Sequence, residues 1–255
     1  MKKIHFTLVI TTILFSLNVL AQTESVEVIV KESLEQLPSE DAQSYCNVME
    51  RLASTGEKGI VEIAGQMMPA DKGENAQFEY AINGVVDYTL RKGNEKYRAG
   101  IIEGLVKALN GCSDNPHKAF LMSELQKCAT PKEFGVFCKY LSDPYLQDFA
   151  ISGIAKLQGA DKKVLKLIKS EKAPREKLAY LAYFKQLKKA EKTLLNWLPT
   201  ADERTKASIY MALTTCGSAK SMKVLEEAAK NEDYKIDATG ATDAYLRMKE
   251  KLGQE

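Results

Sequence analysis

Few residues in this chain have side chains that could carry out catalysis. Only two histidines occur, and His5 lies in the N-terminal leader, so a Cys–His or Ser–His–Asp arrangement would have to use His117. His117 follows Pro116 at the start of an expected helix, where we expect an ordinary exposed side chain. Carboxylates are numerous but dispersed, and no glycine-rich phosphate loop occurs. We therefore expect no catalytic set, no cofactor and a protein without chemistry of its own.

Five cysteines could bind a metal or form disulfides: Cys46, Cys112, Cys128, Cys138 and Cys216. Cys112, His117, Cys128 and Cys138 are separated by 5, 11 and 10 residues and lack the closely spaced ligand pairs of structural zinc sites, so we expect no metal site. The odd number leaves at least one thiol free. A Cys112–Cys128 disulfide is an open alternative, and the pairing of the five is undetermined. Cys128 and Cys216 also fall on core positions of a repeat, which predicts buried, apolar side chains.

The elements that would position these residues are helices of a repeated pattern. Its reference residues Cys128, Leu157, Leu187 and Cys216 are spaced 29, 30 and 29 residues apart. Apolar residues stand seven positions before them (Leu121, Ala150, Tyr180, Ile209), three before (Leu125, Ile154, Phe184, Leu213) and eight after (Val136, Leu165, Leu195, Val224). The positions seven before, three before and at the reference lie within about 60° of one another on a helix. Each repeat therefore carries a narrow apolar stripe that a neighbouring repeat must cover.

The pattern extends beyond these four repeats in both directions. Seven repeats can be placed, with the reference residues Leu52, Tyr88, Cys128, Leu157, Leu187, Cys216 and Met248. Asn115-Pro116, Thr130-Pro131 and Asp143-Pro144 each place a capping residue before a proline, the preferred order at a helix start. No segment has the alternation and turn residues of β-hairpins. The sequence predicts an all-α protein: a right-handed α-solenoid of about seven antiparallel helix pairs, forming a single domain over residues 22–255.

A binding surface is expected on the second helix of each pair, at the two positions before the reference residue. These positions hold Gln126-Lys127, Ala155-Lys156, Lys185-Gln186 and Thr214-Thr215, which stacked repeats would align as a mildly basic row. Tyr183 lies off the centre of the apolar stripe, whereas Tyr180 and Phe184 occupy core positions. The candidate binding residues are Lys127, Lys156, Tyr183, Lys185 and Gln186. The alternative is an ordinary solvated helix face.

The N-terminus has the features of a secretory signal peptide. Lys2 and Lys3 precede an apolar run over residues 4–20, and Ala21 is a small residue suited to cleavage. A membrane span is the alternative, but polar residues interrupt the run and it is short for a bilayer. We expect cleavage after residue 21 and a periplasmic or secreted chain without a membrane anchor. The chain has 36 basic and 34 acidic residues, so removing the two lysines leaves a neutral balance, which argues against a nucleic-acid partner.

Two acidic inter-helix turns, Leu141-Ser142-Asp143-Pro144 and Thr200-Ala201-Asp202-Glu203, and the segment 118–125 followed by Cys128 resemble HEAT-type repeats. They are similar to the short HEAT-like repeats of secreted bacterial proteins, with an armadillo-like variant as the alternative, and the resemblance covers about residues 40–250. It implies that second helices line a concave face that binds partners, and hence a binding or scaffolding module for a protein partner. In some bacterial members the array precedes a sugar-acting domain. The alternative function is therefore an accessory or truncated N-terminal part of a carbohydrate-processing enzyme of the 3-keto-disaccharide hydrolase kind.

Overall fold

The computed structural model describes residues 24–69 and 71–253, which form an all-helical protein. The α-helices are α1 (Val26–Glu35), α2 (Ala42–Ser54), α3 (Gly56–Gly65), α4 (Ala76–Leu90), α5 (Glu95–Gly111), α6 (Asn115–Cys128), α7 (Phe134–Cys138), α8 (Gln147–Lys156), α9 (Asp161–Ser170), α10 (Arg175–Phe184), α11 (Glu191–Trp197), α12 (Glu203–Cys216), α13 (Ala219–Asn231) and α14 (Ala241–Gly253). Three short 3-10 helices lie between them: η1 (Pro131–Glu133), η2 (Lys188–Ala190) and η3 (Leu198–Thr200). No strand occurs in the described ranges, so the all-α prediction is confirmed.

The N-terminal segment and the length of the helices bear on export and on membrane insertion. The expected signal peptide, residues 1–21, lies outside the described residues. Of the helices that the structure describes, none is both long enough and apolar enough to cross a bilayer.

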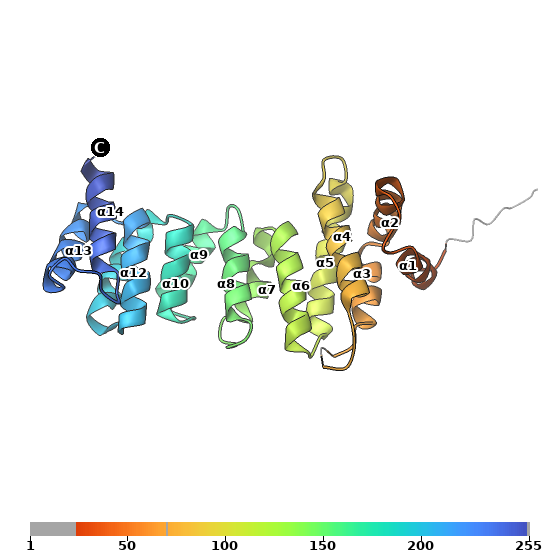
Figure 1. Ribbon diagram of the computed structural model, residues 1–255, viewed down its shortest axis with the longest axis horizontal. Coiled ribbons are helices and arrows are strands. Elements are labelled where there is room, and N and C mark those ends of the chain that lie inside the picture. Colours follow the sequence, from red (N-terminus) through yellow and green to blue (C-terminus); the bar gives the residue numbers. More distant parts are fainter. Residues whose placement is uncertain (1–23, 70, 254–255) are drawn as a thin grey trace, which may run out of the picture.

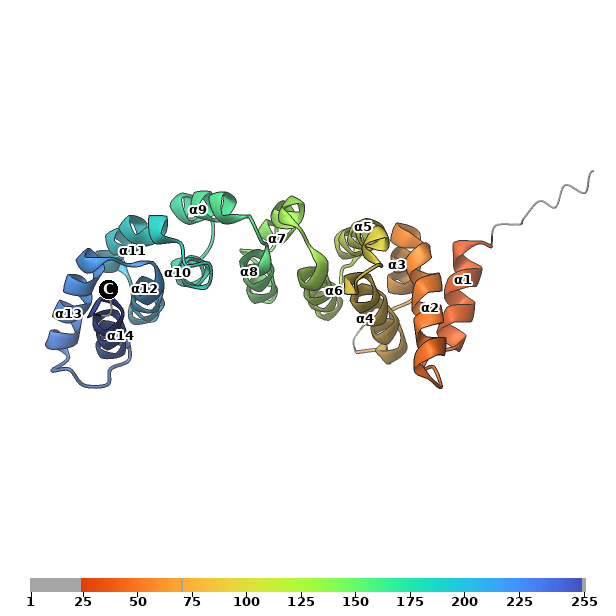
Figure 2. The same cartoon turned by 90° about the horizontal axis from the view of Figure 1, so that it is seen from above.

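The helices follow one another along an elongated arch (Figures 1 and 2). Figure 2 shows α7, α9, α11 and α13 along the outer side of this arch and α6, α8, α10, α12 and α14 along the inner side. Successive inner helices pack on one another, α6 on α8, α8 on α10, α10 on α12 and α12 on α14. We call the surface of these five helices the inner face. The surface of α7, α9, α11 and α13 is the outer face.

Two of the three helix starts predicted at prolines are found, because α6 begins at Asn115 and η1 begins at Pro131. After Asp143-Pro144 a turn comes first, and α8 begins at Gln147. Thr130 caps η1 in a reciprocal pair with Glu133, and Asp143 accepts hydrogen bonds from two amides that follow Pro144. At α6 the capping side chain is Asp114 rather than the next residue, whose backbone is already helical. A short acceptor side chain is needed at each of these starts because the first amides of a helix have no partner within it.

The buried apolar residues form one core cluster that extends from α1 to α14. All seven reference residues are at most 8% exposed: Leu52, Tyr88, Cys128, Leu157, Leu187, Cys216 and Met248. The positions three and seven residues earlier are also buried in α6, α8 and α12: Leu121, Leu125, Ala150, Ile154, Ile209 and Leu213. The predicted apolar stripe therefore faces the core in these three helices.

Helix α10 departs from the predicted register. Its buried residues include Leu178 and Ala182, each 28 residues after its equivalent in α8. The prediction instead placed Tyr180 and Phe184 in the core, and this was wrong. Phe184 is 48% exposed and Tyr180 is only half-buried. The stripe of α10 is therefore offset by two residues from the one that the sequence pattern suggested.

The end of α10 explains this offset. Gln186 adopts the left-handed conformation with a φ of 50°, and the amide of Leu187 donates a hydrogen bond to the Ala182 carbonyl at 3.0 Å. The chain thus folds back at the helix end, and Leu187 reaches the core from beyond the last turn. Lys185 takes the place that Leu157 holds in the preceding repeat. Apolar residues stand at positions 178 and 182 as well as at 180 and 184, so the pattern could not distinguish the two registers.

The register of α10 can be tested with two truncations. Leu178→Ala should lower the free energy of unfolding by about 2–5 kcal/mol, because Leu178 is fully buried and its loss leaves a cavity. Phe184→Ala should lower it by about 1 kcal/mol or less, because much of that side chain already contacts water. Urea denaturation of both variants provides the comparison. Equal losses would mean that Phe184 belongs to the core after all.

Candidate binding surface

Three adjoining hollows lie along the inner face, and together we call them the inner groove. The first, between α6 and α8, has a volume of about 260 Å³. The second, over α8, α10 and α12, has about 290 Å³, and the third, over α10, α12 and α14, about 330 Å³. Asp148 and Ser152 line both the first and the second hollow, and the second and third share two helices as walls. An open surface of this length suits an elongated ligand.

Tyr180, Tyr183, Phe184 and Met211 form a partly exposed apolar cluster on the inner face, here called the aromatic patch. The rings of Tyr180 and Phe184 stack with their centroids 6.1 Å apart and their planes at 29°. Phe184 is 48% exposed and Met211 is 38% exposed. Tyr180 lines the second hollow, while Tyr183 and Met211 line the third. The patch therefore lies where these two hollows meet.

Paired charges cross the second hollow beside the aromatic patch. Lys177 of α10 lies 2.5 Å from the Asp148 carboxylate of α8, and Arg204 of α12 lies 2.7 Å from the Glu176 carboxylate of α10. The two α10 side chains are partly buried, with exposed fractions of 17% and 19%. Asp148 and Arg204 are 69% and 76% exposed. The ion pairs link three successive inner helices, and their exposed members can also contact a ligand.

Three of the predicted binding residues are accessible on this side of the molecule. Tyr183 is half-buried and lines the third hollow. Lys156 is exposed and donates a hydrogen bond at 3.2 Å to Gln126, which lines the first hollow. Lys127 is exposed but lies 2.9 Å from the buried Glu124 carboxylate, which anchors its ammonium group. The structure thus brings Lys156 and Tyr183 near the groove, whereas Lys127 is held between Glu124 of its own helix and Asp87 of α4, which lies 3.4 Å away.

Lys185 and Gln186 are placed differently from the prediction. The Lys185 side chain is only 7% exposed, and Gln186 lies past the end of α10 in the left-handed turn. Because the register of α10 is offset by two, Phe184 occupies the position that Lys127 and Lys156 hold in their helices. The predicted basic row is therefore interrupted by an aromatic side chain at α10.

The Lys185 ammonium group caps the end of α8, the preceding inner helix. Its Nζ donates hydrogen bonds to the Leu157 carbonyl at 2.9 Å and the Ala155 carbonyl at 3.4 Å, at the end of α8. Lys251 of α14 caps the end of α12 in the same way, since its Nζ donates hydrogen bonds to the Thr215 and Thr214 carbonyls at 3.0 and 3.2 Å. The last carbonyls of a helix lack partners within it and carry partial negative charge, so a lysine there is stabilising. Both lysines join neighbouring inner helices.

His117 is 7% exposed, which corrects the expectation of an exposed side chain. Asn75 uses Oδ1 to accept a hydrogen bond from the Met68 amide at 2.9 Å, which places its Nδ2 group 3.0 Å from His117 Nε2. Because the amide nitrogen is a donor, Nε2 must accept, and the ring proton belongs on Nδ1, 3.5 Å from Asp114. Both ring nitrogens are thus engaged. His117 joins the segment before α4 to the start of α6 and offers no free base.

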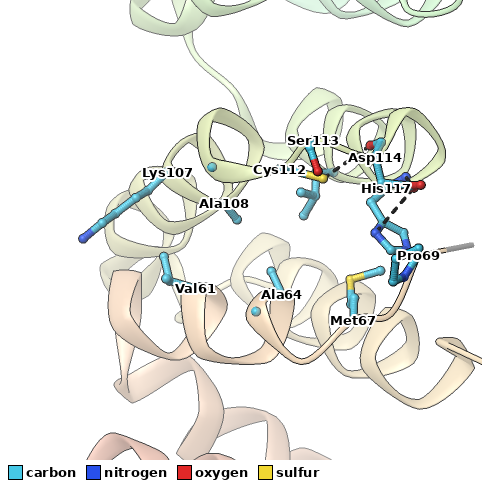
Figure 3. A pocket seen from close by; sticks show the side chains of 13 residues that line it. Val61, Ala64, Met67, Pro69, Lys107, Ala108, Cys112, Ser113, Asp114 and His117 are labelled. Carbon is cyan, nitrogen blue, oxygen red and sulfur yellow. Dashed lines mark hydrogen bonds and ion pairs between the residues drawn. The ribbon is translucent and has the colours of Figure 1, made fainter.

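A separate hollow of about 460 Å³ lies between α3, α5 and α6 (Figure 3). Val61 and Ala64 form part of an apolar wall, and His117 and Asp114 lie at one end. The Cys112 thiol also lines it and donates a hydrogen bond to the Asp114 carbonyl at 3.3 Å. Burial raises the pKa of this thiol, which lowers the fraction of reactive thiolate. The hollow therefore lacks an activated nucleophile.

All five cysteines are free thiols. Cys112 precedes the first residue of the 14-residue α6 and Cys128 is its last, so they lie roughly 20 Å apart and the disulfide considered between them was wrong. Cys128 and Cys216 are buried as predicted, and burial raises the pKa of each to about 12. Within residues 24–69 and 71–253, no three histidine, cysteine, aspartate or glutamate side chains cluster closely enough to hold a metal ion.

Comparison with protein-family models and with curated proteins finds no match for this chain. Its function must therefore be inferred from the chemistry of its surfaces. The inner groove, with its aromatic patch and paired charges, is the surface best suited to a ligand.

The structural role of Lys185 can be separated from that of an exposed lysine. Lys185→Ala should lower the free energy of unfolding by about 1–3 kcal/mol, because carbonyl groups at the end of α8 lose their charged donor. Lys156→Ala should change it by about 0.5 kcal/mol or less, since its side chain is exposed. Urea unfolding followed by circular dichroism measures both. If the two variants proved equally stable, Lys185 would not be a cap for α8.

Proposed function

We propose that this chain is an exported, right-handed HEAT-like α-solenoid that acts as a binding or scaffolding module for a protein partner. The arched succession of helices and the packing of each inner helix on the next support this proposal. The resemblance of its inter-helix turns to HEAT-type repeats adds further support. Repeat arrays of this kind present long inner surfaces that are suited to extended partners.

The observation that carries the proposal is the aromatic patch at the centre of the inner groove. Phe184 and Met211 are each more than one-third exposed, and Tyr180 and Tyr183 beside them are half-buried. Exposed apolar area of this kind is unfavourable in water and is covered when a partner binds. Aromatic residues, methionine and arginine are also the types enriched where protein partners meet, and Arg204 lies in the adjoining hollow. We infer that the patch anchors the partner.

The charges around the patch favour a polypeptide partner over a polymer of uniform charge. Asp148 and Arg204 expose opposite charges on the two sides of α10, and Asp243 and Arg247 form another such pair, 2.8 Å apart, beside the third hollow. A polyanion would meet the exposed carboxylates as repulsive groups. A folded or extended polypeptide can offer both signs at the appropriate positions.

The proposal includes export from the cytoplasm. Residues 1–21 have the charge and apolar pattern of a signal peptide. The mature chain, residues 22–255, would then be periplasmic or secreted and would meet its partner there.

A carbohydrate ligand is the second candidate, favoured by the composition of the second hollow. Tyr180 offers a ring face, Ser152 and Ser208 offer hydroxyl groups, and Glu176 offers a carboxylate. These are groups that can bind a sugar ring. In that case the chain would serve as an accessory or N-terminal part of a carbohydrate-processing enzyme of the 3-keto-disaccharide hydrolase kind. The open form of the groove favours the polypeptide.

Site-specific photo-crosslinking tests the main proposal. A photoreactive phenylalanine analogue at position 184, in the protein expressed in its own cells, should give a discrete adduct with one protein. Phe184 stacks on Tyr180, which lines the second hollow. The matched control is position 145, where Tyr145 is 51% exposed and belongs neither to the aromatic patch nor to the lining of the three hollows. It should give no such adduct. Met211→Ala should weaken the binding of the identified partner by roughly tenfold or more, as truncation of an anchor does.

The outcomes distinguish the candidates. The same adducts from both positions, or no protein adduct from position 184, would contradict a partner site at the aromatic patch. Saturable binding of a defined oligosaccharide that is lost in Tyr180→Ala would favour the carbohydrate candidate instead.

A further inference from the structure

The outer face carries a cluster of lysines that is separate from the inner groove. α9 supplies Lys162, Lys163, Lys166 and Lys169, and the segment formed by η2 and the start of α11 supplies Lys188, Lys189 and Lys192. We call these seven exposed residues the outer basic patch. η2 packs on α9, so the two groups of lysines adjoin, and Figure 2 shows α9 and α11 side by side on the outer side of the arch.

The carboxylates within the same segments are already occupied by other partners. Asp161 lies 3.3 Å from Lys185, and Glu171 accepts a hydrogen bond from Arg175 at 2.9 Å. Glu191 accepts hydrogen bonds from two serine hydroxyls at the start of α13, at 2.7 and 2.6 Å. By contrast, none of the seven lysines forms an ion pair with any residue in the described part of the chain. Lys163 is the one whose ammonium group has a backbone partner there, since it donates a hydrogen bond to the Pro131 carbonyl at 2.6 Å. The patch therefore has a local excess of positive charge that the nearly neutral composition of the chain conceals.

The side chains of the patch are suited to electrostatic attraction of anionic groups. The cluster contains lysine but no arginine, so it lacks the planar group that binds phosphates or bases through two hydrogen bonds. None of the large apolar residues exposed on the described surface belongs to α9, η2 or α11. The apolar side of α9, formed by Val164, Leu167 and Ile168, is buried in the core. The patch can therefore neither stack on bases nor insert into a lipid layer.

We propose that the outer basic patch docks this protein on the anionic phospholipid headgroups of a membrane surface. Clustered lysines bind anionic headgroups without specific geometry, and each adds to the attraction. A single-stranded nucleic acid is less suitable, because its binding sites combine such charge with stacking side chains or a groove, and the patch has neither. The patch also lies on the outer side of the arch, where a flat surface can touch it (Figure 2). The inner groove lies on the opposite side and stays open to its ligand.

Co-sedimentation with lipid vesicles tests this proposal. The protein used should be residues 22–255, which contain the whole described fold but not the apolar leader, because the leader would itself bind lipid. It should bind vesicles that contain about 30% phosphatidylglycerol at low salt, and binding should fall at least about tenfold when sodium chloride rises to about 0.5 M, since salt screens such attraction. Vesicles of phosphatidylcholine alone should not bind it.

Charge-reversal variants locate the docking surface. Lys162→Glu, Lys166→Glu and Lys169→Glu combined should reduce vesicle binding at least about tenfold, because the attraction scales with the number of lysines near the surface. The matched control combines Lys31→Glu, Lys72→Glu and Lys92→Glu, which are exposed lysines far from the patch in sequence and give the same net charge. It should reduce binding much less. Glutamine in place of glutamate at the three α9 positions provides a second variant in case charge reversal disturbs folding, and melting curves verify both.

Three results would overturn the proposal. One is equal binding to neutral and anionic vesicles. Another is an equal loss of binding in the patch and control variants, which would show that net charge alone is responsible. The third is tighter binding of the patch to a short DNA duplex than to anionic vesicles, lost in the same α9 variants. None of these results depends on what the inner groove binds.

Discussion

Each inner helix in this protein has an apolar stripe that only its neighbours can cover, and the two faces of the arch follow from that constraint. Leu125, Ile154 and Leu213 are fully buried at equivalent positions along the inner row. Gly153 lets the Phe137 ring lie directly against α8, where a larger residue would collide with it. Since the stripe fixes which side of a helix faces the core, it also fixes which side chains line the inner groove.

The sequence predicted the helices and most of the core because both depend on local spacing. Buried Cys128 and Cys216 followed from that spacing. The register of α10 could not be predicted, since a two-residue offset turns a helix by about 200° yet leaves an apolar residue at each expected position. In the structure the chain turns back at Gln186, and Ala182 rather than Phe184 lies in the core. Because of this offset the sequence pattern placed Tyr180 and Phe184 in the core, and it did not predict the aromatic patch, which is the main feature of the candidate site.

Other corrections arise from partners that are distant in the chain. His117 is buried because Asn75, 42 residues earlier, occupies its Nε2 nitrogen. Lys185 is nearly buried because the end of α8 offers carbonyl groups about 30 residues away. Spacing along one helix contains no information about either contact. A lysine whose spacing predicts an exposed position can therefore be buried in the structure, where it caps the end of a neighbouring helix.

The inner and outer faces differ in how their charges are arranged. Inner charges such as Lys177 and Asp148 are paired around an exposed aromatic cluster, whereas the outer lysines of α9 form no ion pair with the described residues, and Lys163 donates only to a backbone carbonyl. The register of α10 is the claim on which the inner surface depends. Hydroxyl-radical footprinting of the unmodified protein tests it most directly, because oxidation rates follow side-chain exposure. The account predicts that Phe184, at 48% exposure, is oxidised much faster than Phe137, which is fully buried. Equal protection of the two phenylalanines would contradict it.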